Sequence, residues 1–194
     1  MRPPNRPTEF STFKKLIATP ELPDLGPGPR FGIEPIATLA QKLDTHFDRS
    51  NLPRAAGQLL RAAALLWHDH HEEAHRIAQE DESPEGSFLH GILHRREPDS
   101  SNAKYWFRRV GKHPSFSALA EEVKNFLGPQ PDPKMHAKLF PHGTWDPFGF
   151  IDFCDRAVSL PSSDPLRKQL QQIQALEFDT LIAYLFERGL KDSP

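Results

Sequence analysis

The sequence predicts an all-α fold of antiparallel helical hairpins, arranged like a helical repeat or as an irregular bundle, with an extended proline-rich N-terminal arm. Apolar residues recur at intervals of three and four, for example at Leu59, Ala63 and Leu66, as they do along one face of a helix. The 20 prolines fall into a few clusters, which places them between helices and not within them. No stretch shows the alternation of apolar and polar residues that is typical of a strand.

Length, charge and cysteine content limit the class of protein. The chain of 194 residues fits one domain, which we expect over residues 31–194, preceded by the arm over residues 1–30. The net charge of -2 gives no general reason to bind nucleic acid or a membrane surface, and no apolar run is long enough to span a bilayer. The single cysteine, Cys154, excludes an internal disulfide. We therefore expect a soluble, cytoplasmic protein with neither nucleic acid nor membrane as a partner.

The N-terminal arm includes the segment "ATPELPDLGPGPR", whose prolines and glycines favour extended backbone. Three apolar residues precede this segment, Phe10, Phe13 and Leu16. We expect the arm either to lie on the surface or to dock onto the helical body through these three side chains.

Two helices are expected directly before and within the histidine-rich part of the chain. The apolar spacing continues without a break, which predicts one long helix from about Pro53 to Glu80. A second helix begins at Ser83, a good N-cap that is followed by Pro84 at the first helical position, and it runs to about Arg96.

The remaining elements are also helical. A third helix is capped by Ser100 or Ser101 and ends at Gly111, and a fourth covers "SFSALAEEVKNFLG". The stretch "GPQPDPKMHAKLFPHGTWDP" is expected to be irregular because of its prolines. A short helix then opens at Asp146, and a long amphipathic helix covers residues 164–188.

The stretch "GSFLHGILHRREPDSSNAKYWFRRVG", residues 86–111, resembles one Sel1-like or tetratricopeptide-like unit. In this comparison Gly91 is the small residue that faces the partner helix, Asp99 lies in the polar turn, and Trp106 lies on the returning helix. The same stretch also resembles a group of uncharacterised bacterial and fungal proteins in which "HRREPD", "NAKYW" and "VGKHP" occur together. The first resemblance implies a helical hairpin, and the second implies no role for any residue.

Four histidines are expected to face one another across the second hairpin. His71 and His75 are four residues apart, as are His90 and His94, so each pair lies on one face of its helix. If the two helices are antiparallel and turn between residues 81 and 84, residues whose numbers sum to about 165 lie at the same height. This places His75 opposite His90 and His71 opposite His94.

Such a cluster has the chemistry of a metal site. "HEEAH" matches the pattern of zinc peptidases, in which His71 and His75 would bind the metal and Glu72 would activate its water. A metal-assisted hydrolase is therefore one interpretation, with a divalent metal, zinc first, bound by His71, His75, His90 and His94. His94 or Glu97 would complete a set of three ligands.

The turn "HRREPDSSN" provides a second kind of chemistry next to the histidines. Arginine side chains bind carboxylate or phosphate with two parallel hydrogen bonds, and aromatic faces stack on planar groups, which favours a small anionic ligand. Arginine and glutamate at helix ends equally pair with each other, and this structural interpretation stays open.

Two functions of different classes follow from these patterns. The first is a small-molecule or metal site, and its expected ligand-binding residues are Asp69, His75, His90, His94, Arg96, Glu97, Asn102 and Trp106. The second is a helical protein interaction module without catalytic activity, in which the aromatic residues of "AKYWF" form the binding face.

Overall fold

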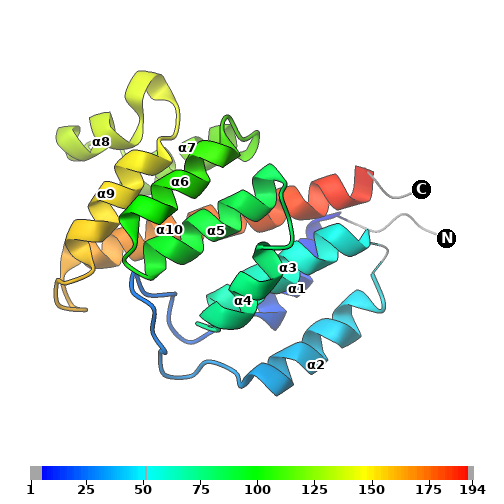
Figure 1. Cartoon of the computed structure of the whole chain (residues 1–194). Coiled ribbons are helices and arrows are strands. Elements are labelled where there is room, and N and C mark those ends of the chain that lie inside the picture. Colours follow the sequence, from blue (N-terminus) through cyan, green and yellow to red (C-terminus); the bar gives the residue numbers. More distant parts are fainter. Residues whose placement is uncertain (1–5, 51, 192–194) are drawn as a thin grey trace.

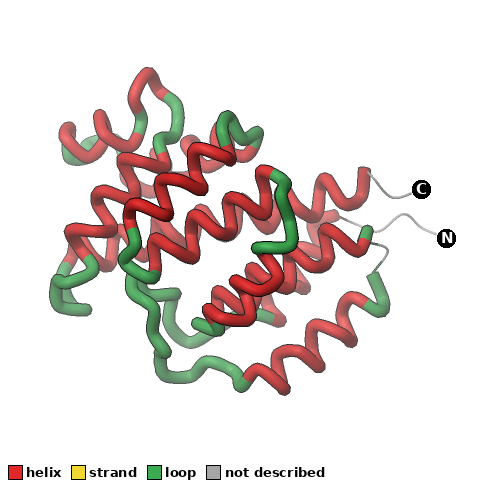
Figure 2. The backbone as a smooth tube through the Cα atoms, in the orientation of Figure 1, coloured by secondary structure: helices red, strands yellow, loops and turns green. Residues whose placement is uncertain are grey.

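The structure is a computed structural model of the chain, and it describes residues 6–50 and 52–191. These residues form ten α-helices and one short 3-10 helix, and none of them lies in a strand (Figure 2). The predicted all-α fold class is therefore confirmed. The helices are α1 (Arg6–Leu16), α2 (Ile36–Phe47), α3 (Arg54–Trp67), α4 (His71–Ala78), α5 (Pro84–Arg96), α6 (Ser100–Val110), α7 (Ser115–Leu127), α8 (Pro133–Leu139), η1 (Pro141–Gly143), α9 (Pro147–Ala157) and α10 (Pro165–Lys191).

Helix α5 is the centre of the fold. Every residue from Glu85 to Arg96 is buried, because α3, α4, α6 and α9 all pack against this helix (Figure 1). Helix α6 returns along α5 as an antiparallel hairpin, and a side chain at Gly91 would collide with the ring of Phe107 at 2.5 Å. The absence of a side chain at Gly91 thus sets how closely the two helices approach.

The long helix α10 joins two hydrophobic clusters. Its second half packs Phe178, Leu181 and Ile182 against α1, α3 and the α4–α6 region, all with no exposed surface. Its first half packs Leu170 and Ile173 against α7, α8 and α9. Figure 1 shows α10 running behind the other helices from one side of the molecule to the other.

The prediction of one helix from Pro53 to Glu80 is wrong, because α3 ends at Trp67 and α4 begins at His71. Asp69 lies between them with a φ of 62°, in the left-handed region that no continuous helix contains. Its side chain accepts hydrogen bonds from the backbone amide and the guanidinium of Arg30, and from Arg96. These distant partners hold the break, and the local apolar spacing gives no sign of them.

The N-terminal arm differs from the extended segment that its composition predicts. Residues 6–16 form α1, and Phe13 and Ile17 are fully buried in the main core. Residues 17–35 then cross the molecule without regular structure, as the long loop in Figure 2 shows. The arm thus docks onto the helical body through Phe13, which is one of the two alternatives expected for it. The first five residues of the predicted arm lie outside the described residues.

Two local predictions also need correction. The N-cap of α6 is Asp99, whose carboxylate accepts a hydrogen bond from the amide of Asn102 at 3.1 Å, and not Ser100 or Ser101. Residues 133–139 form α8 inside the segment predicted to be irregular, since Asp132 caps it and Pro133 fits its first turn. The expected caps at Ser83 and Asp146 are confirmed.

None of the described helices has the length and apolar character that a transmembrane span needs.

Candidate functional site

Three of the four predicted histidines converge between α4, α5 and α6. The ring centroids of His75 and His90 are 5.0 Å apart, and those of His75 and His94 are 5.6 Å apart. His90 and His94, one turn apart on α5, have nearly parallel rings with centroids 6.0 Å apart. We call His75, His90 and His94, with Asn102 and Trp106 from α6, the histidine cluster. The pairing of His75 with His90 is the geometry that the hairpin predicts.

His90 is the buried centre of this cluster. Its ring stacks on the indole of Trp106, with centroids 4.0 Å apart and an angle of 9° between the ring planes. His90 as a whole is only 1% exposed. Neither ring nitrogen forms a hydrogen bond of normal geometry among the residues that the structure describes, although the Gly86 backbone, one turn earlier on α5, acts as a weak partner that raises the pKa of His90 slightly. Buried polar groups in native proteins nearly always have a partner, so these nitrogens call for a water molecule or a ligand.

The surroundings keep His90 neutral. Burial lowers the pKa of His90, the neighbouring His75 and His94 lower it further, and the result is a pKa of about 4. At neutral pH the ring therefore has one N–H donor and one lone pair. A neutral imidazole is able to donate a hydrogen bond, accept one, or take up a proton when an anion approaches.

His94 is held by two of the residues that were expected in the site. Its Nδ1 lies 2.9 Å from the Glu97 carboxylate, and the amide nitrogen of Asn102 lies 3.2 Å from its Nε2. The pair with Glu97 spans three residues at the end of α5, where the carboxylate is exposed. Glu97 therefore orients the ring of His94 from outside, while Asn102 closes the cluster from α6.

Arg109 belongs to this site although the sequence did not single it out. Its guanidinium lies 5.4 Å from the centre of the Trp106 ring, and its charge contributes to the low pKa of His90. The three-residue spacing between Trp106 and Arg109 on α6 is the signal that helical periodicity offers for it. Arg109 adds a positive charge at the outer edge of the cluster.

His71 does not join the other three histidines. Burial lowers the pKa of His71 to about 4, and the next largest effects come from Arg96 and Asp69, which are not part of the cluster. The ligand set expected from "HEEAH" is therefore not assembled, because its two histidines have different neighbours. Among the described residues, no group of three or more His, Cys, Asp or Glu side chains is placed to hold a metal ion.

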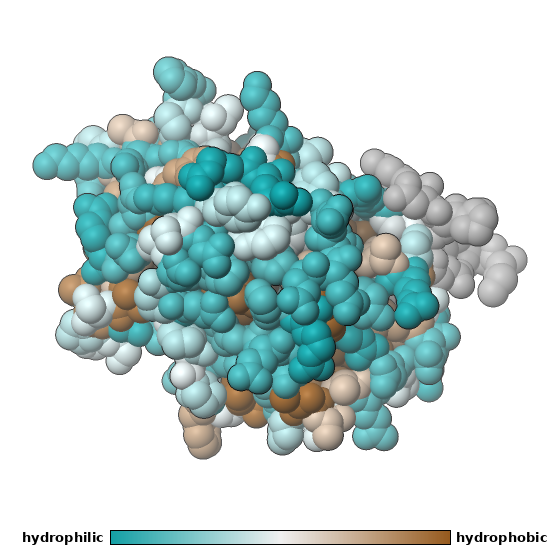
Figure 3. All heavy atoms as spheres, in the orientation of Figure 1, coloured by the Kyte–Doolittle hydropathy of each residue, from teal (hydrophilic) through white to brown (hydrophobic). Residues whose placement is uncertain are grey.

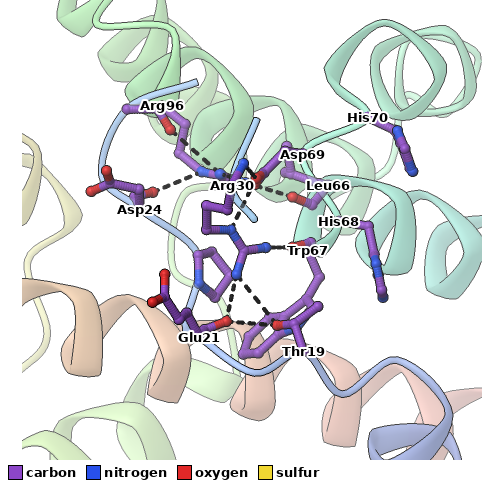
Figure 4. Close-up of polar contacts among 12 residues, drawn as sticks. Thr19, Glu21, Asp24, Arg30, Leu66, Trp67, His68, Asp69, His70 and Arg96 are labelled. Atoms are coloured by element: carbon purple, nitrogen blue, oxygen red, sulfur yellow. Dashed lines mark hydrogen bonds and ion pairs between the residues drawn. The ribbon is translucent and has the colours of Figure 1, made fainter. Parts of the chain in front are cut away.

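Arg96 and Asp69, also expected in the ligand site, are part of a buried ionic network (Figure 4). Both side chains have no exposed surface, and Arg96 donates to Asp69 at 2.6 Å. Arg96 also donates to the backbone carbonyls of Leu66 at 2.5 Å and of Asp24 at 3.0 Å. Burial would raise the pKa of Asp69, but the charges and hydrogen bonds of Arg96 and Arg30 lower it. The guanidinium of Arg96 therefore binds the protein itself and is not open to a ligand.

Arg30 completes the network from the irregular N-terminal segment. It donates from its backbone amide to Asp69 at 2.8 Å and from its side chain to Asp69 at 2.9 Å, and it also binds the carbonyl of Trp67 (Figure 4). Gly28, with φ at 81°, passes so close that a side chain there would meet the Asp69 carboxylate at 2.7 Å. The network thus fastens residues 17–35 to the break between α3 and α4.

Arg95 is likewise internal. Its guanidinium donates to both carboxylate oxygens of Glu177, at 3.1 and 2.5 Å, and stacks over Phe150 with its central carbon 4.4 Å from the ring centre. Both charged side chains are buried, so this pair links α5 to α10 without facing solvent. Arg95 therefore binds within the protein, but its partner is a buried glutamate on α10 and not a neighbour at the same helix end, as the structural interpretation of the "HRREPD" turn assumed.

Ser115, His113 and Glu85 line up in a way that resembles a catalytic triad. The Ser115 hydroxyl lies 2.7 Å from Nδ1 of His113, and Nε2 of His113 lies 3.7 Å from the Glu85 carboxylate. The backbone amide of Ser115 also donates to Nδ1, which occupies the lone pair that would accept the hydroxyl proton. All three residues are buried, and the arrangement holds the start of α7.

The face of the molecule in Figure 3 is mainly hydrophilic, with only small hydrophobic groups. On the histidine cluster, His75, Asn102 and Trp106 are half-buried and lead from the surface to the buried His90. No family model, no curated protein and no solved structure matches this chain.

Proposed function

We propose that the protein binds a small anionic ligand at the histidine cluster. The observation that carries this proposal is the pair of buried ring nitrogens of His90, which form no hydrogen bond of normal geometry within the described part of the chain. A buried water molecule would also satisfy these nitrogens and would imply no function. Here, however, the nitrogens adjoin two more imidazoles and an arginine. The combination of the neutral His90 ring, which is able to take up a proton, and a nearby guanidinium suits an anion better than a cation.

The positive charge around the histidine cluster supports an anionic ligand. Arg109 lies over Trp106, and His75 and His94 both repel a proton from His90. An anion placed beside these rings would reverse that repulsion, so the cluster would take up protons when the ligand binds. Binding would therefore become tighter as the pH falls through the titration range of the imidazoles.

Sulfate tests the proposal because its charge is constant near neutral pH. Titration calorimetry of the full chain should show sulfate binding that strengthens as the pH falls from neutral toward the pKa of His90, about 4, with uptake of protons. His75→Asn should weaken this binding about tenfold, whereas His142→Asn, at an exposed histidine elsewhere, should leave it unchanged. Absence of sulfate binding, or binding that His75→Asn does not weaken, would overturn the proposal.

Zinc distinguishes the metal interpretation in the same experiment. A metal competes with protons for the imidazoles, so zinc binding would weaken as the pH falls, which is the opposite of the sign expected for sulfate. Stoichiometric zinc binding with that sign, lost in His75→Asn, would favour a metal site and the hydrolase that it implies.

The alternative of a protein interaction module has one supporting observation. Tyr105 is 47% exposed next to Trp106, whereas Phe107 of the same "AKYWF" stretch is buried against α5. One exposed ring makes a smaller binding face than the sequence predicts. We infer that Tyr105 borders the histidine cluster.

A further inference from the structure

A second polar site lies between α1 and α2, on residues that the proposed function does not use. A groove of about 780 Å³ opens there, which is within the usual size range of small-molecule sites. Its lining includes Lys15 from α1, and Lys42 and Arg49 from α2 and the turn after it. Glu9 is the acidic residue of the lining, so the groove carries a net positive charge.

The cations of the groove differ in their surroundings. Lys42 pairs with Glu34, whereas Lys15 on α1 and Arg49 in the turn after α2 are exposed residues that line the groove. Two cationic side chains that line one groove are suited to hold a phosphate group between them.

Two buried polar atoms in the groove have no hydrogen-bond partner within residues 6–50 and 52–191. They are Oε2 of Glu9 and Nε2 of His46, and both residues line the groove. The ring of His46 packs against Phe13 and Phe47, at centroid distances of 5.6 and 5.3 Å, and burial lowers its pKa. A carboxylate oxygen accepts hydrogen bonds only, and a neutral imidazole nitrogen accepts or donates one. Both atoms are shielded from solvent, so hydroxyl groups of a ligand would satisfy them once the side chains of Glu9 and His46 turn toward the groove.

We propose that the groove between α1 and α2 binds a phosphate ester of a small polyhydroxylated molecule. The phosphate would lie between Lys15 and Arg49, and the hydroxyls would donate to Glu9 and contact His46. Thr12 and Thr38 add further hydroxyl groups to the walls. This site is separate from the histidine cluster, since the two share no residue.

Three probes separate the parts of this proposal. Ribose 5-phosphate has both the phosphate and the hydroxyls, inorganic phosphate has only the first, and ribose has only the second. Titration calorimetry of the full chain should show ribose 5-phosphate binding about tenfold or more tightly than either fragment. Binding of ribose 5-phosphate no tighter than that of inorganic phosphate would overturn the proposal.

Charge reversal locates the site. The double variant Lys15→Glu/Arg49→Glu should lose affinity for ribose 5-phosphate about tenfold or more, and Lys134→Glu, an exposed lysine on α8, is the matched control and should not. Glu9→Gln should reduce the preference for ribose 5-phosphate over inorganic phosphate and leave phosphate binding in place. An equal loss of affinity for ribose 5-phosphate in Lys134→Glu would contradict the site. A loss of this affinity in His75→Asn but not in the double variant would place the ligand at the histidine cluster instead.

Discussion

Two polar regions meet on α5, and they differ in how their hydrogen bonds are satisfied. In the ionic network, the guanidinium of Arg96 binds Asp69 and backbone carbonyls on both sides of it. In the histidine cluster, the ring of His90, four residues before His94 on the same helix, has nitrogens that form no hydrogen bond of normal geometry among the described residues. The side chains at their centres, Arg96 and His90, are both buried.

The difference separates a structural from a functional use of buried polarity. A charged group in the interior is tolerated only when it is paired and hydrogen-bonded, and each guanidinium nitrogen of Arg96 has a partner. An unpaired buried group costs stability, so a folded protein retains one mainly where a ligand or bound water supplies the partner. Removing Arg96 should therefore damage the fold, and changing the histidine cluster should alter binding and titration more than folding.

The largest effect is expected from Arg96→Met. The substitution leaves Asp69 as a buried charge with one guanidinium partner fewer, and it should cost about 3 to 5 kcal/mol in the free energy of unfolding. Urea unfolding of this variant measures the cost. Arg109→Met, at an exposed arginine, is the control and should change stability by less than about 0.5 kcal/mol. Similar small losses in both variants would show that the network does not hold the fold.

The next effect is the pH dependence of stability from His90. Its pKa is about 4 in the folded protein and near its ordinary value of 6.5 in the unfolded chain, so the unfolded state binds the proton first as the pH falls. The neutral His90 therefore contributes about 3 kcal/mol to the free energy of unfolding above pH 6.5. This contribution is lost as the pH falls from 6.5 to about 4. Because His71 also has a pKa of about 4, part of the slope should remain when the unfolding of His90→Asn is measured, but the loss of stability across this range should be about 3 kcal/mol smaller than in the wild type. The full wild-type slope should persist in His142→Asn, and a His90→Asn curve parallel to the wild-type curve would refute the burial of a neutral His90.

A smaller effect is expected from the stack of His90 on Trp106. A double-mutant cycle with Trp106→Leu and His90→Leu should give a coupling of about 0.5 to 1.5 kcal/mol, because parallel rings at this distance attract beyond their burial. Chemical unfolding of the four proteins supplies the coupling. Additive losses would mean that the two rings are not stacked in solution.

The smallest effect is expected from Glu97→Gln. The pair between Glu97 and His94 joins residues three apart with an exposed carboxylate, and such pairs contribute only a few tenths of a kcal/mol. Thermal unfolding at low salt should show that Glu97→Gln is slightly less stable than the wild type. At high salt this difference in stability should disappear. A loss of more than about 1 kcal/mol would indicate that Glu97 holds more than the orientation of one ring.

The sequence predicted the part of the site that depends on local spacing. The four-residue spacing of His90 and His94 and the turn before Pro84 determine that His75 meets His90, and both features can be read locally. The break at Asp69 could not be predicted in this way. It depends on Arg30 and Arg96, which lie 39 and 27 residues away along the chain.

The roles of the two arginines were hidden for the same reason. A run such as "HRREPD" is typical of an exposed turn, but α9 and α10 cover one side of it, and the segment around Asp24 covers the other. Which side chains become buried depends on these long-range contacts. The different positions of His71 and His75 follow from the break at Asp69, which the apolar spacing does not reveal.

The most direct test of the account is the titration of the histidine side chains by nitrogen-15 NMR, with and without sulfate. We predict that the pKa of His90 is about 4 in the free protein, and that sulfate raises it. Sulfate should leave the ring signals of the exposed His142 unchanged. A His90 ring that is already protonated near pH 6, or one whose titration sulfate does not change, would contradict the claim that its buried nitrogens are part of an anion site.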